Sequence, residues 1–277
     1  MRGARIAPIL LCLVMLPHCG AVRRVDAPIL RIHGSDTMLV LTRLWAEEYM
    51  REHSGVSVYT GGGGTATGAE LLARGEADIC AASRPLLPEE ARRLARNFRT
   101  LGMSILVAKD ALSIYLHPDN PVRDLTLEQI RDIYLGGIGN WSEVGGRDAT
   151  IRLLNRMPNS GTFLYFKEHV LEGAAYSEAV ETLPTTRRII EEVASDPDAI
   201  GYGGIAYSER IYACPIDGVA PTRENVIRDL YPLTRYLYLY TVSSPEGQVK
   251  EFIDWTLGPR GQELVTRAGF FPIWNPE

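Results

Sequence analysis

Residues 56–85 read VSVYTGGGGTATGAELLARGEADICAASRP, and this stretch decides the fold. It begins with a short strand pattern (56–59), passes through a glycine-rich turn, and continues as a helix that ends at Gly75. A second, fully apolar strand pattern follows at 77–82. A strand, a helix and a strand joined in this order predict a βαβ unit with parallel strands.

The same alternation of strand and helix patterns continues on both sides of this unit. Upstream, a strand is expected at 28–33 and a helix at 37–53, where Leu41, Trp45 and Tyr49 recur at helical spacing. Downstream, a helix is expected at 88–98 with proline at its start. The chain changes character after residues 105–118. The later segments are a helix at 125–137, strands at 151–156 and 234–242, a stretch of strand and turn at 199–207, and a long helical run at 248–268.

This order of elements predicts an α/β protein with two lobes, each a mixed sheet flanked by helices. The length of 277 residues also favours two domains over one. We expect the first lobe to comprise residues 28–107 plus 222–277, and the second to comprise residues 108–221. The C-terminal segment then returns to complete the first lobe.

The first residues form a targeting segment. Arg2 and Arg5 precede an apolar run at 6–16, which is too short to span a bilayer and typical of a signal peptide. We expect a lipoprotein-type signal peptide at 1–18, lipidation at Cys19 and a tether at 19–27. Cleavage after Ala21 is the alternative.

Two cysteines, Cys80 and Cys214, lie beyond this targeting segment and in different predicted lobes. We expect both to be buried apolar side chains, because thiols of this kind are among the most buried residues. A disulfide between them is the less favoured alternative.

The charge balance restricts the class of partner. The formal net charge is −5 with a sequence pI of about 5.7, whereas a nucleic-acid binder carries a basic stripe. We therefore expect no nucleic-acid partner. An anion would have to be held by a local site, since the overall field of the protein opposes it.

Such a local site is suggested by turns that combine glycine with hydroxyl side chains, each between a predicted strand and a helix. They lie at 33–37, 60–68, 81–85 and 159–162. Each one alone is explained by helix capping, but turns at the carboxyl ends of strands are also where α/β proteins bind ligands. We expect the turns to converge on one cleft. Their hydroxyl side chains are the candidate anion ligands: Ser35, Thr37, Thr65, Ser83, Ser160 and Thr162.

Charged residues beside these turns sharpen the prediction. Arg84 and Arg156 each lie within four residues of a turn serine, and the planar guanidinium suits a tetrahedral oxyanion. Asp36 repels a fully ionised anion but can accept a hydrogen bond from a protonated one, which favours hydrogen phosphate over sulfate. A helix-capping role for Asp36 is the alternative.

The glycine run at 61–64 does not indicate a nucleotide loop. No lysine follows the last glycine, as it does in a Walker loop. A flexible turn, or a close approach of backbone amides to a small anion, explains the run better.

These motifs resemble those of a known family, the PstS-like phosphate-binding proteins of bacterial ABC phosphate importers, which are type II periplasmic binding proteins. The resemblance covers nearly all of the mature chain. It rests on GSDT (34–37), the segment 61–86, RMPNSGT (156–162), AIGYGGIAY (199–207) and the closing segment 246–273. The Arg-x-x-x-Ser-Gly-Thr motif is the most specific part.

The resemblance implies two lobes that close on one inorganic phosphate and deliver it to the membrane subunits of an ABC permease. By motif, phosphate contacts would come from Arg156 and from Ser160, Gly161 and Thr162 in the second lobe. The first lobe would contribute Asp36, Thr37 and Thr65. One departure concerns Arg84, which stands where some members have a proton-accepting aspartate and others also have arginine. The proton-accepting role then falls to Asp36 or to no residue.

The sequence leaves two other functions open. An enzyme acting on phosphate esters would need a cluster of metal ligands or a G-x-S-x-G elbow. The histidines are scattered without metal-ligand spacing, and the sequence contains no G-x-S-x-G motif. A binding protein or sensor for another oxyanion, such as sulfate or molybdate, fits the same turns. We expect a monomer that is not an enzyme, with no cofactor and no metal, in contact with the membrane only through the lipid anchor.

Overall fold

The computed structural model describes residues 29–274, without the side chains of residues 207–209. The predicted signal peptide and the whole tether, with Cys19 and Ala21, lie outside the described residues. Within the range that is described, no helix is both long and apolar enough to cross a bilayer.

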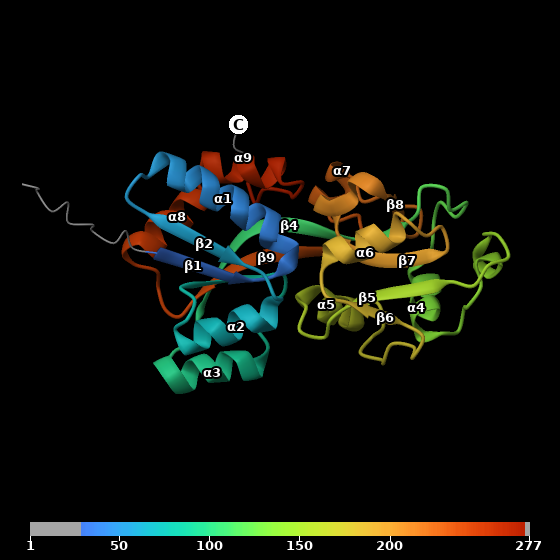
Figure 1. Ribbon diagram of the computed structural model, residues 1–277, viewed down its shortest axis with the longest axis horizontal. Coiled ribbons are helices and arrows are strands. Elements are labelled where there is room, and N and C mark those ends of the chain that lie inside the picture. The colour runs from blue at the N-terminus through green and yellow to red at the C-terminus, as the bar shows by residue number, and fades with distance from the viewer. Residues whose placement is uncertain (1–28, 275–277) are drawn as a thin grey trace, which may run out of the picture.

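The protein is an α/β structure with two lobes (Figure 1). The elements of the first lobe are β1 (Ile29–Gly34), α1 (Leu39–Glu52), β2 (Ser57–Gly61), α2 (Thr65–Arg74), β3 (Ile79–Ala82), α3 (Pro88–Phe98), α8 (Gly247–Leu257) and α9 (Pro259–Arg267). Those of the second lobe are α4 (Leu127–Leu135), β5 (Arg152–Arg156), α5 (Gly161–His169), β6 (Glu181–Leu183), α6 (Thr186–Val193), β7 (Ala199–Gly204), β8 (Tyr212–Cys214) and α7 (Arg223–Ile227). Two further strands, β4 (Met103–Leu116) and β9 (Thr234–Thr241), run between the lobes.

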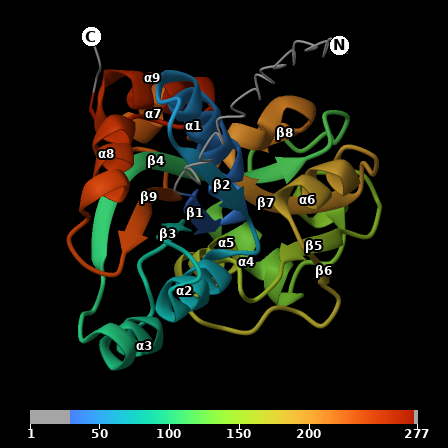
Figure 2. The same cartoon turned by 60° about the vertical axis from the view of Figure 1, so that its left-hand side comes forward.

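The strands form one path in the order β2-β1-β3-β9-β4-β7-β5-β6, with β8 paired to β4. β1 is parallel to both β2 and β3, and β5 is parallel to both β6 and β7, whereas β4 and β9 are antiparallel to their neighbours. Figure 2 shows α1, α8 and α9 on one face of the first-lobe sheet, with α2 and α3 on the other. The predicted mixed sheet flanked by helices is confirmed.

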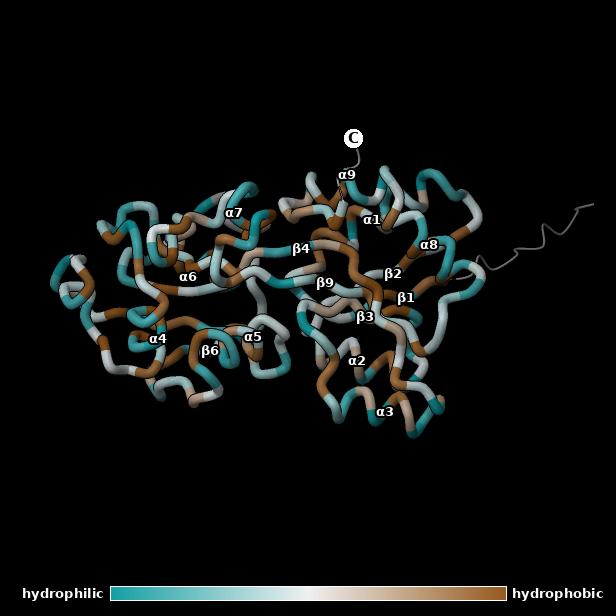
Figure 3. The backbone as a smooth tube through the Cα atoms, turned by 180° about the vertical axis from the view of Figure 1, so that it is seen from behind, coloured by the Kyte–Doolittle hydropathy of each residue, from teal (hydrophilic) through white to brown (hydrophobic). Residues whose placement is uncertain are grey.

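Each lobe has its own hydrophobic core, and β4 contributes to both. Val107 and Ala108 pack into the first core, while Ala111 and the residues after it pack into the second. In the returning segment, Leu233 still belongs to the second core and Leu237 to the first. Figure 3 shows hydrophobic stretches along the central strands and hydrophilic ones on the outer loops. By side-chain packing, we place the outward crossing near residue 109 and the return near residue 235, later than the expected boundary at 221.

The expected elements of the first lobe are confirmed, down to the helix at Pro88–Phe98 and the stop at Gly75, whose φ of 72° is left-handed. The prediction of a single helical run at 248–268 is wrong. It consists of α8 and α9, which are separated at Gly258, where the backbone is extended. The reason is Pro259: a residue that precedes proline is driven out of the helical region, and proline itself starts the next helix. Both Cys80 and Cys214 are buried free thiols, as expected.

Candidate functional site

Three of the oxygen-rich turns meet at one edge of the first-lobe sheet, because parallel strands end on the same side. Ser35 follows β1 and Ser83 follows β3, and the Ser35 Oγ donates to the Ser83 Oγ at 3.0 Å. The Ser83 backbone N–H donates to the Oγ1 of Thr65, the first residue of α2, at 3.3 Å. All three side chains are buried. Gly34 allows this approach, since a Cβ there would lie 2.1 Å from the carbonyl oxygen of Ala81.

The second lobe contributes the turn between β5 and α5. Ser160 is the N-cap of α5, and its Oγ accepts the backbone N–H of Thr162 at 3.1 Å. Ser160 and Thr162 are both buried, and Gly161, in the first turn of α5, lies against the hydroxyl cluster of the first lobe. The first turn of a helix carries backbone N–H groups that have no partner within the helix.

The two lobes are closed on each other at this point. The hydroxyl oxygens of Thr37 and Thr162 are 2.9 Å apart. Asn159 of the second lobe donates from Nδ2 to the carbonyl oxygen of Gly63 at 2.9 Å, and its own carbonyl oxygen accepts the N–H of Ala66 at 3.2 Å. The structure thus brings all four predicted turns together.

Gly161 determines how closely the lobes approach. A Cβ at this position would lie 2.5 Å from the Oγ of Ser83 and 2.6 Å from the Oγ1 of Thr65. Gly161→Ala is therefore expected to shift the lobe equilibrium toward an open form by about 1–3 kcal/mol, the usual cost of overpacking. Small-angle X-ray scattering would show a larger radius of gyration. Gly139→Ala, at a position with no neighbour within 4 Å, is the matched control, and equal scattering from both variants would contradict this role.

Arg156 is the most buried cation of the cluster, with 1% of its surface exposed. Its Nη1 donates to Thr186 Oγ1 and its Nη2 to Asp36 Oδ2, both at 2.7 Å. Asp36 also accepts the backbone N–H of Gly63 at 3.1 Å through Oδ1. The guanidinium is thus fixed between the lobes by an ion pair to the first lobe and a hydroxyl of the second.

Arg84 is held differently. Its two terminal nitrogens donate to the two carboxylate oxygens of Glu90, each at 2.7 Å, and both side chains are buried. Glu90 is the third residue of α3, where it also accepts the N–H of Leu87 at 2.8 Å. The geometry gives Arg84 a role in anchoring α3 to the turn. A contact from Arg84 to a ligand stays a prediction.

A second ion pair, absent from the sequence-based prediction, lies beneath the Thr37–Thr162 contact. Arg235 of β9 and Asp110 of β4 are directly opposite each other in the antiparallel register. The Nε and Nη2 of Arg235 donate to Asp110 Oδ2 at 3.0 and 2.8 Å. Its Nη1 donates to Thr162 Oγ1 at 3.1 Å, and its Nη2 approaches Thr37 Oγ1 at 3.4 Å. Arg235 thus binds hydroxyls of both lobes from the strands that join them.

This pair is fully enclosed, with 2% of the Arg235 side chain and 0% of the Asp110 side chain exposed. Burial raises the pKa of Asp110 above its ordinary value, and the Arg235 guanidinium works in the opposite direction. A signal for both residues was available in the sequence. Each is a charged residue within a strand pattern that is mostly apolar or aromatic, and a charge buried in such a strand requires a partner.

Together these groups suit a small tetrahedral oxyanion. Buried hydroxyls, the amides at the start of α5 and a fixed guanidinium all offer hydrogen-bond donors in a site shielded from water. Because Arg235 donates to the oxygens of Thr37 and Thr162, a hydroxyl hydrogen of this pair remains available to another acceptor.

Comparisons with known proteins agree with this architecture. A PBP superfamily domain matches residues 21–260. Phosphate-binding protein PstS of Bacillus subtilis is 31% identical, covering 88% of this chain and 80% of the relative. Phosphate-binding protein PstS of Pseudomonas aeruginosa is 28% identical, covering 87% and 81%.

A solved structure gives the same result. A substrate-binding protein assigned to phosphate ABC transport in Clostridium perfringens, determined with bound phosphate, superposes with a TM-score of 0.83 at 30% identity. The superposition covers 89% of this chain and 100% of that one. On sequence, fold and domain match alike, this chain belongs to the PstS phosphate-binding proteins of the PBP superfamily.

Proposed function

We propose that this chain captures inorganic phosphate between its two lobes and delivers it to the membrane subunits of an ABC importer. The observation that carries the proposal is the Arg156 guanidinium, buried between the lobes and directed by Asp36 and Thr186. The names of the relatives and the phosphate bound in the Clostridium perfringens structure support phosphate as the ligand. The protein is a binding protein and not an enzyme, in keeping with its family.

In this proposal the ligand is held by groups of both lobes. The second lobe provides Arg156, the Ser160 and Thr162 hydroxyls and the amides at Gly161. The first lobe provides the side chains that lie against them: Ser35, Asp36, Thr37, Thr65 and Ser83. Lobe closure removes water from the anion, so that each charge-assisted hydrogen bond contributes more than it would in bulk solvent.

Asp36 is the proposed reader of the phosphate proton. It accepts from Arg156 through Oδ2 and from the Gly63 N–H through Oδ1, and a carboxylate oxygen can accept more than one hydrogen bond, including one from a protonated ligand. Sulfate carries no proton at neutral pH, and would meet this carboxylate as a like charge. Arg84 cannot take this role because arginine is not a proton acceptor.

Calorimetric titration tests the proposal. The protein is unfolded and refolded to remove any bound ligand, and is then titrated with phosphate and with sulfate at about pH 7. One-to-one binding of phosphate and markedly weaker binding of sulfate are expected. Equal binding of both anions would retain an oxyanion site but remove the role of Asp36 in selectivity. Absence of phosphate binding would overturn the proposed function.

We also propose that the protein works outside the cytoplasm as a monomer, anchored to the membrane by a lipid at Cys19. The sequence LPHCG, which follows the apolar run, supports this placement. Metabolic labelling with palmitate should mark the parent chain and leave Cys19→Ala unlabelled. A labelled Cys19→Ala chain would contradict the anchor.

A further inference from the structure

The two sides of the seam between the lobes differ. On one side, Asn159 of the second lobe is hydrogen-bonded to Gly63 and Ala66 of the first lobe, so the lobes are in contact there. On the other side, between α1 and α6, lies a cavity of about 390 Å³. Its walls come from both lobes, with Asp36, Val40 and Arg43 facing Thr186 and Arg187.

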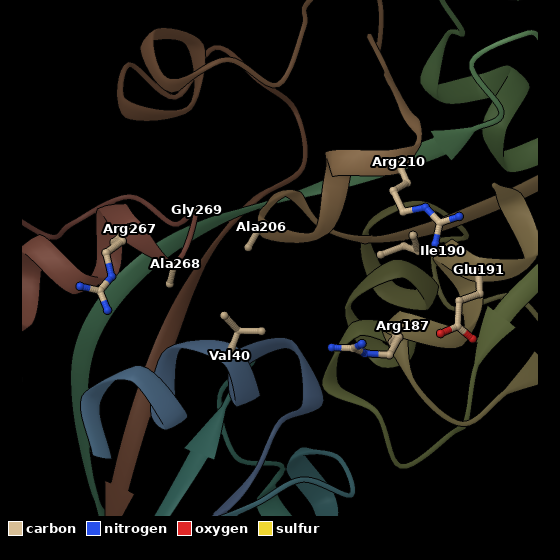
Figure 4. Close-up of a pocket in the computed structure, with 9 residues that line it drawn as sticks. All are labelled: Val40, Arg187, Ile190, Glu191, Ala206, Arg210, Arg267, Ala268 and Gly269. Atoms are coloured by element: carbon tan, nitrogen blue, oxygen red, sulfur yellow. The ribbon is translucent and has the colours of Figure 1, made fainter. Parts of the chain in front are cut away.

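This cavity continues into a second one of about 350 Å³, which shares Val40 and Arg187 and adds Arg210 and Arg267 (Figure 4). Arg210 ends the short 3-10 helix η3 (Ile205–Arg210), which follows β7. In Figure 4, Arg187 and Arg210 line one side of the cavity, and Val40 and Arg267 line the other. We call the joined hollow the arginine groove, after Arg43, Arg187 and Arg210.

The inner end of the arginine groove is the candidate site itself. Asp36 and Thr186, which line the larger cavity, are the two side chains that hold the Arg156 guanidinium at 2.7 Å each. An anion that follows the groove inward therefore arrives at the buried cation of the site.

The groove carries a local excess of positive charge. Arg43, Arg187 and Arg210 are exposed, and none of them forms an ion pair within the described part of the chain. The two acidic side chains that line the groove form ion pairs with other arginines: Glu191 with Arg188 at 2.8 Å, and Asp36 with Arg156. The protein as a whole has a formal net charge of −5, so a dianion approaching elsewhere meets repulsion.

We propose that the arginine groove is the mouth through which an inorganic oxyanion enters, and that its three arginines increase the rate of capture. The inference rests on the proposed function and adds the route and the residues that govern association. Clefts lined with one sign of charge focus the field and can raise association rates by about 10–10³-fold. Since the arginines lie outside the buried cluster, they act on association and leave dissociation almost unchanged.

The experiment compares Arg43→Gln/Arg187→Gln/Arg210→Gln with the parent protein. Equilibrium dialysis with radiolabelled phosphate gives Kd, and chase with unlabelled phosphate gives the dissociation rate, so their ratio yields the association rate. The matched control is Arg92→Gln/Arg96→Gln/Arg99→Gln. It removes the same charge from the α3 region at the far end of the first lobe (Figure 1), where none of the three has an ion pair in the described chain.

In low salt, the groove variant is expected to associate about tenfold more slowly, with a dissociation rate within about twofold of the parent value. The control should change association much less. In about 1 M salt, where the Debye length is about 3 Å, the difference between the groove variant and the parent should largely disappear.

Three results would overturn the proposed mouth: equal association rates for the groove variant and the control, a loss that persists undiminished in high salt, or an effect confined to dissociation. In each of these the parent still binds phosphate, so the proposed function stands. Failure of the parent protein itself to bind phosphate would overturn the function and the mouth together.

Discussion

Replacing Arg156 by alanine is expected to weaken phosphate binding about a thousandfold. The guanidinium would give the ligand two charge-assisted hydrogen bonds of roughly 1.5–3 kcal/mol each, and about 4 kcal/mol corresponds to three powers of ten in Kd. The substitution also leaves Asp36, which is 10% exposed, without its ion pair and facing the anion. Calorimetric titration measures the effect.

Two further variants isolate the cause. Arg156→Lys keeps the charge but loses the planar fork, so an intermediate loss of about 10–100-fold is expected. Arg152→Ala removes an arginine of the same strand whose partners, Glu181, Glu192 and Asp196, are partly exposed, and it should bind like the parent. If folded Arg156→Ala bound phosphate within about fivefold of the parent, the anion would have to be held elsewhere.

Replacing Arg235 by methionine is expected to destabilise the protein by about 3–5 kcal/mol, because it leaves the buried carboxylate of Asp110 uncompensated. The strands that join the lobes would then carry an unpaired charge, and Thr37 and Thr162 would lose a shared donor. Urea unfolding, followed by circular dichroism, gives the free energy of unfolding.

The matched control replaces both partners. Asp110→Leu/Arg235→Met contains no buried charge at this position, so its loss of stability should be clearly smaller than that of Arg235→Met alone. If the double variant were the less stable of the two, the Coulombic pairing of Asp110 with Arg235 would not be the main contribution of these residues.

The pH dependence of Arg235→Met follows from the raised pKa of Asp110. Burial raises this pKa, and the variant loses the guanidinium that opposes the shift. Asp110 binds its proton more tightly in the folded state than in the unfolded state, so low pH favours folding. This stabilisation is lost as the pH rises through the raised pKa of Asp110. The deficit of the variant should therefore be smaller at about pH 5 than at about pH 8. Equal deficits would show that Asp110 does not titrate in this way.

The sequence allowed most elements and the four turns to be predicted, because each is encoded by a few adjacent residues. Gly75 ends α2, Pro88 begins α3, and Ser160 caps α5 through local geometry that any chain would share. The convergence of the turns also followed, since the carboxyl ends of parallel strands lie on one edge. The break between α8 and α9 was missed because the apolar spacing continues across Gly258, although the Gly-Pro pair marks it.

The partners of the charged residues could not be predicted in the same way. Asp110 and Arg235 are 125 residues apart and meet only through the antiparallel register of β4 and β9, which no local pattern specifies. Arg84 illustrates the converse. Its neighbour Ser83 led to the prediction of a ligand contact, which stays a prediction, while the pairing of its guanidinium with Glu90, six residues further on, was not foreseen. Its place beside a turn predicts where the backbone of a residue lies, but it does not predict the direction of a long side chain.

The position of β9 has a consequence for how the protein is made. Residue 80 of β3 pairs with residue 240 of β9, and β9 also separates β3 from β4 in the sheet. As the chain emerges from its N-terminus, β3 therefore has no neighbour on one side until nearly all the residues have been synthesised. The second lobe, built between the two crossings, can assemble first. Synthesis of the first lobe therefore begins first, but its folding is completed last. The nascent chain stays incompletely folded until β9 has been made, in keeping with the export proposed above. A chain that stops before Thr234 would keep the edge of β3 exposed and would be prone to aggregation.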